Sequence, residues 1–80
     1  MEKELMEQEM RCLLESLGIK TDIVLFSNKE IYIELMDSKS LTIPWPDAEA
    51  RKMLMKDKKG LALFMLSGLV VALVAALDEA

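Results

Sequence analysis

The chain lacks histidine altogether and has a single cysteine, Cys12, among its 80 residues. Without histidine, Ser-His and Cys-His nucleophilic pairs and histidine metal sites are excluded. One cysteine can neither close an intrachain disulfide nor complete a structural zinc site. The three glycines, at 18, 60 and 68, stand too far apart to form a phosphate loop, and the acidic residues lack calcium-loop spacing. The sequence therefore predicts a protein that is not an enzyme, with no cofactor and no metal.

These absences also bear on how so short a chain stays folded. A domain of this size buries only about two thirds of its unfolded surface and is marginally stable alone. Disulfides and structural metals, the usual supplements of small domains, are excluded. Oligomerisation is the supplement that remains.

Charge is absent from one long stretch and concentrated elsewhere. The net charge of −4 argues mildly against a general nucleic-acid binder. The N-terminus, MEKELMEQEM, is acidic from its second residue, unlike a signal peptide, so a cytoplasmic location is expected. A basic surface is expected, and its simplest interpretation is a solvated helix face. The alternatives are contact with anionic lipid, with nucleic acid, or with the acidic N-terminal helix of a second copy or a partner. It comprises Arg51, Lys52, Lys56, Lys58 and Lys59.

Residues 1–18 are expected to form an amphipathic helix. Met6, Met10 and Leu17 fall on one apolar stripe, and Gly18 stands where a helix commonly ends. Glu7 and Arg11 are four residues apart, the spacing of a surface ion pair. Cys12 lies off the stripe and is expected to be half-buried rather than a redox thiol.

Residues 19–46 alternate apolar and polar side chains, which predicts a three-stranded antiparallel meander. A turn at Asn28 sets Val24 opposite Ile33. Because a one-residue slip would reverse every side chain, burial favours a second connection of odd length, such as residues 38–40, with Ile43 opposite Leu35. One face is then apolar and needs a cover. Its members are Val24, Phe26, Ile31, Ile33, Leu35, Ile43 and Trp45.

Two helices are expected after the meander. Asp47 is a suitable N-cap for a basic helix over residues 47–59. An apolar helix over 61–78 follows, with a break near 57–60, where Gly60 can end the first helix. The alternative is one continuous helix from about residue 47 to 78, which would pass through Gly60 at a cost of about 1 kcal/mol.

The stretch from Leu61 to Leu77 has no charge and only one polar side chain, Ser67. A helix that is apolar on all sides is either buried or in a membrane. The seventeen residues reach about 26 Å, less than the roughly 30 Å hydrocarbon core, and no Trp or Tyr stands at either end. In a monomer of this size, part of the stretch would stay exposed to water.

A stripe of small residues in this stretch suggests how copies could assemble. Gly68 and two alanines recur at four-residue intervals, which lets two helix backbones approach closely. The bulky opposite side would then pack on the chain's own sheet and first helix. The expected oligomer or partner interface is Met65, Gly68, Val71, Ala72, Ala75 and Ala76.

The sequence thus predicts a single small α+β domain over residues 1–80, with an N-terminal helix, a three-stranded meander and a C-terminal helical region. We expect a non-enzymatic, oligomeric interaction protein that acts as a regulator, inhibitor or adaptor, with itself and an unidentified protein as partners. One alternative is a tail-anchored membrane protein with residues 1–59 in the cytoplasm. Others are a monomer that hides its last helix in another protein, and a nucleic-acid binder that uses residues 51–59.

Overall fold

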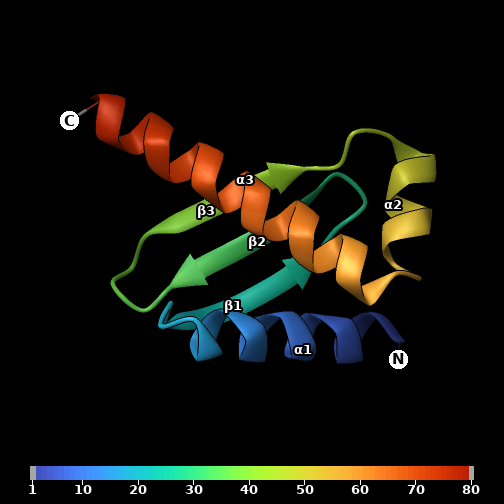
Figure 1. Ribbon diagram of the computed structural model, residues 1–80. Helices are drawn as coiled ribbons and strands as arrows, with labels where there is room; N and C mark the ends of the chain where they lie inside the picture. Colours follow the sequence, from blue (N-terminus) through green and yellow to red (C-terminus); the bar gives the residue numbers. More distant parts are fainter. Residues whose placement is uncertain (1, 80) are drawn as a thin grey trace.

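The computed structural model describes residues 2–79, without the side chains of Glu2, Ala76 and Glu79. An N-terminal helix precedes a three-stranded antiparallel sheet, and two helices follow it (Figure 1). The predicted α+β fold is confirmed. The elements are α1 (Glu2–Ser16), β1 (Thr21–Phe26), β2 (Glu30–Leu35), β3 (Ser40–Pro44), α2 (Ala48–Leu54) and α3 (Lys58–Glu79).

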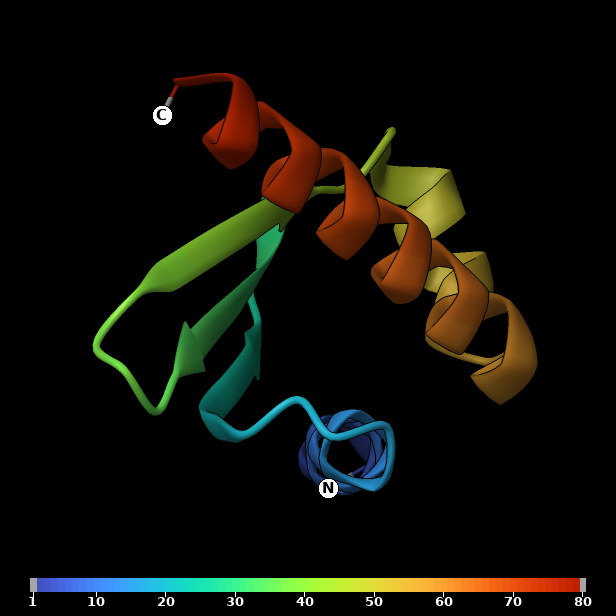
Figure 2. The ribbon, with the colours of Figure 1, turned by 60° about the vertical axis from the view of Figure 1, so that its left-hand side comes forward.

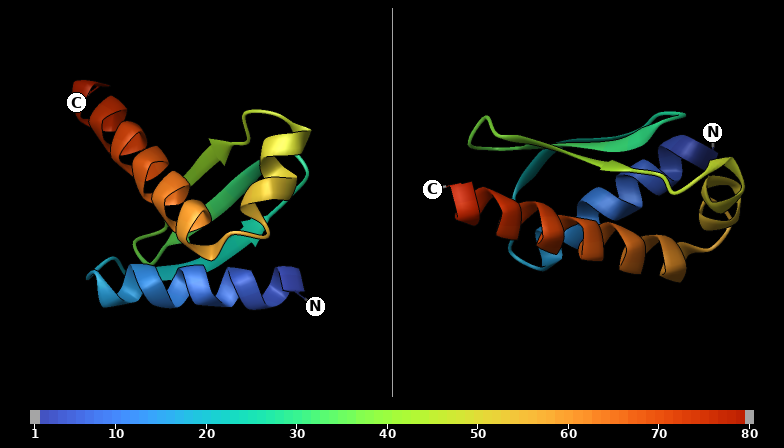
Figure 3. Two further views of the ribbon diagram at one scale, coloured as in Figure 1. Left: turned by 45° about the vertical axis from the view of Figure 1, so that its right-hand side comes forward. Right: turned by 90° about the horizontal axis from the view of Figure 1, so that it is seen from above.

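The molecule has two layers, with the sheet in one and α1 and α3 in the other. Figure 2 shows α1 end-on beside β1 while α3 crosses the same face of the sheet at an angle. Seen from above in Figure 3, both helices lie on one side of the strands, and α2 packs at the end where β3 leaves the sheet. The single apolar face of the sheet is therefore shared between two helices.

The core lies between these layers. Every predicted inward residue of the sheet is buried except Leu35, which is half-buried. The aromatic side chains close one end, since the ring of Trp45 stacks on Phe64 at 5.6 Å and meets Phe26 edge-on at 5.9 Å. The buried set is Met6, Met10, Leu14, Val24, Phe26, Ile31, Ile33, Ile43, Trp45, Leu61, Met65 and Leu69.

The first hairpin has the predicted register, with Val24 opposite Ile33. In the second hairpin the connection has an odd number of residues, as predicted. The predicted register is wrong, because Ile43 lies opposite Ile31 rather than Leu35. The turn comes two residues earlier than expected. The Leu35 N–H donates to the Lys39 carbonyl at 2.7 Å, which encloses residues 36–38, and Ser38 has a φ of 74°. A residue with positive φ at the end of a three-residue loop produces this hairpin geometry.

The C-terminal helices are separated by a short break at residues 55–57. Asp47 caps α2 as predicted, because its carboxylate accepts from the Ala50 N–H at 2.7 Å. Asp57 does the same for α3, accepting from the Gly60 N–H at 3.1 Å. Gly60 therefore lies in the first turn of α3, together with Lys58 and Lys59, and does not end the preceding helix.

Candidate interaction surface

The free edge of β1 is covered by α1. The carboxylate of Glu7 accepts a hydrogen bond from the Phe26 backbone N–H at 2.7 Å, and the Arg11 guanidinium donates to the Asp22 carbonyl at 3.5 Å. Glu7 and Arg11 thus bind the strand edge in place of the helix-surface pair expected from their spacing. A strand edge that a helix covers is less open to pairing with another strand. The helix layer, rather than this edge, is where unpartnered apolar surface remains.

The helix α3 contributes fully buried side chains to the core over its first half only. Leu61, Met65 and Leu69 are 0–3% exposed. Beyond Leu69 the helix projects past the strands, and Figure 3 shows its last turns clear of the sheet. Its apolar side chains there are largely in solvent: Val70 60%, Val71 69%, Leu73 47%, Val74 51% and Leu77 74% exposed. The expected exposed apolar patch is present in this half of α3.

The small-residue side of α3 faces the chain's own sheet. A Cβ added to Gly68 would lie 2.6–2.9 Å from side-chain atoms of Ile43, so the helix backbone approaches β3 closely at that point. The bulky side, expected against the sheet, is the side that faces solvent. Gly68 therefore lets α3 pack within the chain, in place of the close approach to a second copy that its spacing suggested.

The predicted interface residues separate into distinct environments. Met65 is fully buried in the core, Ala72 is half-buried, and Val71 and Ala75 are exposed. The side chain of Ala76 lies outside the described residues. Val71, Ala72 and Ala75 border a hollow of about 340 Å³ between α3 and β3. The structure thus brings these three together and leaves Met65 out of reach of any partner.

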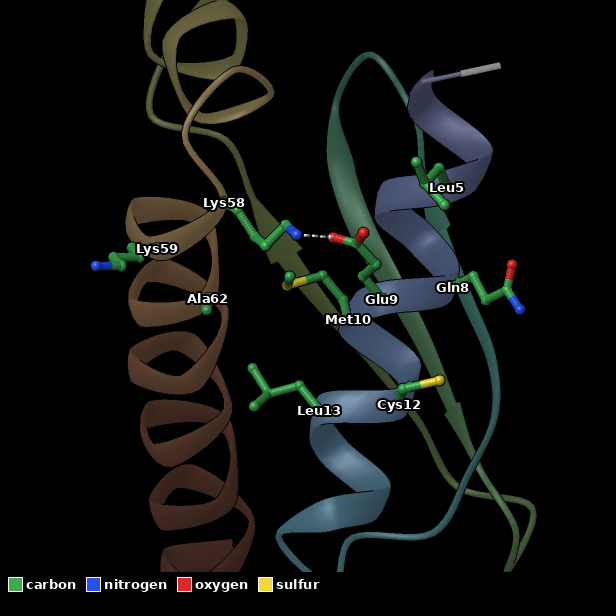
Figure 4. Close-up of a pocket in the computed structure, with 9 residues that line it drawn as sticks. All are labelled: Leu5, Gln8, Glu9, Met10, Cys12, Leu13, Lys58, Lys59 and Ala62. Carbon is green, nitrogen blue, oxygen red and sulfur yellow. Dashed lines mark ion pairs between the residues drawn. The ribbon is translucent and has the colours of Figure 1, made fainter.

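A second hollow, which we call the α1–α3 groove, lies on the other flank of α3 (Figure 4). It measures about 550 Å³ and is walled by apolar side chains from both helices. At one end the Lys58 Nζ lies 2.9 Å from the Glu9 carboxylate, which ties the start of α3 to α1. The lining residues are Leu5, Gln8, Glu9, Met10, Cys12, Leu13, Lys58, Lys59 and Ala62. Cys12, expected to be half-buried, is exposed here.

The expected basic surface is spread over α2, the break and the first turn of α3. Lys52, Lys56, Lys58 and Lys59 are exposed, whereas Arg51 is half-buried. Lys58 is neutralised by its pairing with Glu9. An exposed ion pair of this kind contributes only about 0.2–1 kcal/mol, so it orients the two helices more than it stabilises them.

Within residues 2–79 as described, no three His, Cys, Asp or Glu side chains converge as metal ligands would. The titratable group with a distinct shift is Tyr32, on the open face of the sheet. Its hydroxyl donates to the Glu34 carboxylate at 3.1 Å, and this bond, with burial and the nearby negative charge, raises the pKa of Tyr32 above its ordinary value.

Comparison with known proteins adds no relative to this description. No family model, no curated protein and no solved structure matches the chain. The function must therefore be inferred from the chain's own surfaces.

Proposed function

We propose that the protein is a small, non-enzymatic interaction protein that assembles with copies of itself through the exposed half of α3. The observation that carries this proposal is the apolar surface beyond Leu69, where bulky side chains stay in solvent over about two helical turns. Monomeric soluble proteins rarely expose contiguous apolar patches larger than a few hundred Å², and larger patches mark interaction sites. Each Å² removed from water there contributes about 25 cal/mol.

Assembly would also supply the extra stabilisation that a short chain without disulfides requires. The core of one copy rests on a single sheet face and two helices, and half of its most apolar helix contributes nothing to that core. A second copy would bury that half without any addition to the chain. As an oligomer, the protein is suited to regulate, inhibit or scaffold another protein that its remaining surfaces contact, in the cytoplasm.

The alternative is a membrane anchor, and one observation favours it. Within the described part of the chain, α3 alone is long and apolar enough to cross a membrane, judged by length and composition. However, Leu61, Met65 and Leu69 fill the core, and a spanning helix would have to remove them from it. The part of α3 beyond the core, residues 70–79, is only about 15 Å long, half of the hydrocarbon thickness.

Fractionation followed by light scattering tests the proposal. The full chain is expressed without detergent, and the mass of the soluble material is compared with the 9.0 kDa of one copy. We expect soluble protein with a mass of two copies or more. Recovery only in the membrane fraction would establish the anchor, and a soluble monomer at all concentrations would refute both assignments.

A matched pair of variants locates the contact. Val70→Lys places a charge on the exposed half of α3, and Leu25→Lys places one on the open face of the sheet, where Leu25 is 50% exposed. Since neither side chain belongs to the core, both variants should fold. Val70→Lys should lower the mass to one copy, while Leu25→Lys should leave it unchanged. The reverse result would move the interface to the sheet.

A further inference from the structure

The exposed side of α3 carries a regular pattern that the small-residue stripe obscures. Leu63, Leu66, Val70, Leu73 and Leu77 are spaced three, four, three and four residues apart. This is the a/d repeat of a coiled-coil seam, in which each side chain inserts between residues of a facing helix. We call these five residues the α3 seam.

The seam is open to solvent. Leu63 is 68% exposed, Val70 60%, Leu73 47% and Leu77 74%, and Leu66 is half-buried. Leu66 also packs against the core, but the exposure of the other four positions has no intramolecular explanation, because Leu61, Met65 and Leu69 supply the contact with the core from another side of the helix. A facing helix is the partner that this spacing fits.

Charge at the two ends of the seam selects the direction of that partner. Lys59 extends the same repeat by one position at the start of α3, and Asp78 follows Leu77 at its end. Two parallel copies would place Lys59 against Lys59 in one layer. Two antiparallel copies place Lys59 beside Leu77 and Asp78, and they also oppose the helix dipoles. The charges therefore complement each other only in an antiparallel pair of identical helices.

The α1–α3 groove offers a binding surface for the C-terminal end of the partner helix. Figure 4 shows Leu5, Leu13 and Ala62 along the groove, with Lys58 and Lys59 where α3 begins. Lys58 is turned toward Glu9, whereas Lys59 is turned to the side of α3 away from α1. An antiparallel partner would lay its last turn along this end, with an apolar side chain against the apolar walls and a carboxylate near Lys59. A seam of two heptads is too short to hold two helices alone, and the groove adds the contact that it lacks.

Building on the proposed self-assembly, we infer that two copies pair through an antiparallel contact of their α3 seams, with the last turn of each α3 in the α1–α3 groove of the other. An a position faces a d position in each layer, so Leu63 lies opposite Leu73 of the second copy and Leu66 lies opposite its Val70. The same register sets Lys59 level with Leu77. The interface is self-complementary, as a twofold dimer requires.

Thiol crosslinking tests the direction and register. In a Cys12→Ser background, Leu63→Cys and Leu73→Cys are made separately, and each is treated with a short bifunctional thiol reagent, alone and after mixing. Both original side chains are exposed, so the variants should fold. In the antiparallel pair the two positions meet only between different variants, while identical positions lie about 15 Å apart along the axis. The mixture should give a crosslinked dimer and each variant alone only background.

The possible results separate this inference from the proposed function. Crosslinking of each variant with itself would show a parallel pair, and a dimer by light scattering with no crosslink in the mixture would show another interface. Either result overturns the antiparallel seam and leaves self-assembly standing. A monomer by light scattering would overturn both.

Discussion

Glu7 is a charged residue in a buried position, on the side of α1 that faces the sheet. It is 9% exposed, and its carboxylate accepts from the Phe26 N–H, an edge group that no neighbouring strand satisfies. A buried hydrogen bond to a charged group contributes about 1.5–3 kcal/mol, and removing it leaves the backbone donor unpaired. This side chain therefore helps to hold the first helix in place against β1, together with Arg11 and the apolar core.

Replacing Glu7 by alanine should lower the free energy of unfolding by about 1.5–3 kcal/mol, measured by urea denaturation. Glu7→Gln keeps an acceptor oxygen and should cost less. Glu4→Ala removes an exposed carboxylate from the same helix and serves as the control. Equal stability of the Glu7→Ala and Glu4→Ala variants would rule out the role of the carboxylate at the strand edge.

Ser38 holds a backbone conformation that favours glycine. Its φ of 74° lies in the left-handed region, which costs a residue with a Cβ about 1–2 kcal/mol. Ser38→Gly should therefore raise the free energy of unfolding by about 1 kcal/mol in thermal denaturation. Ser40→Gly, in β3, should lower it by about 0.5–1 kcal/mol. A loss of stability in both variants would argue against the three-residue loop.

Tyr32 is the only tyrosine, so its ionisation can be followed directly by ultraviolet absorbance. The hydrogen bond to Glu34 raises the pKa of Tyr32 above its ordinary value of 10.0, and Glu34→Gln should bring that pKa back toward this value. Since the folded state favours the neutral phenol, the stabilisation is complete below pH 10 and is lost as the pH rises through the raised pKa. An unchanged titration in Glu34→Gln would exclude the pair.

At the scale of elements, the contact between α3 and β3 depends on Gly68. A methyl group there would meet the Ile43 side chain, so Gly68→Ala should destabilise the fold by about 1–3 kcal/mol. In an Ile43→Ala background the same substitution should stabilise it by up to about 1 kcal/mol, because alanine is the better helix former. Urea unfolding of the original chain, of Gly68→Ala, of Ile43→Ala and of the double variant measures this change of sign. The same sign in both backgrounds would contradict the close approach.

The sequence was sufficient to predict element types, strand order and the apolar face of the sheet, because strand and helix periodicities differ and Asp47 marks a helix start. It did not predict the exact second turn, since Ser38 gives no sign of a positive φ. Nor did it predict which side of α3 faces inward. A stripe around Gly68 suits a neighbouring helix or a strand equally well, and only the position of Ile43 decides between them. The seam from Leu63 to Leu77 could have been found from its heptad spacing.

At the scale of the whole molecule, the two halves of α3 lie in different surroundings. The first half of α3 completes the core, and the second half extends beyond the sheet with its large apolar side chains exposed to water. The proposed burial against a second copy would account together for the short chain, the exposed seam and the groove beside it. The account predicts that the protein is stable as an assembly and much less so as a single chain.

Sedimentation equilibrium of the unmodified chain, in detergent-free buffer over a range of concentrations, tests this central claim most directly. The account predicts a mass that approaches twice 9.0 kDa as the concentration rises. A mass of 9.0 kDa at every concentration would contradict it, because the exposed half of α3 would then have no partner among copies of this chain.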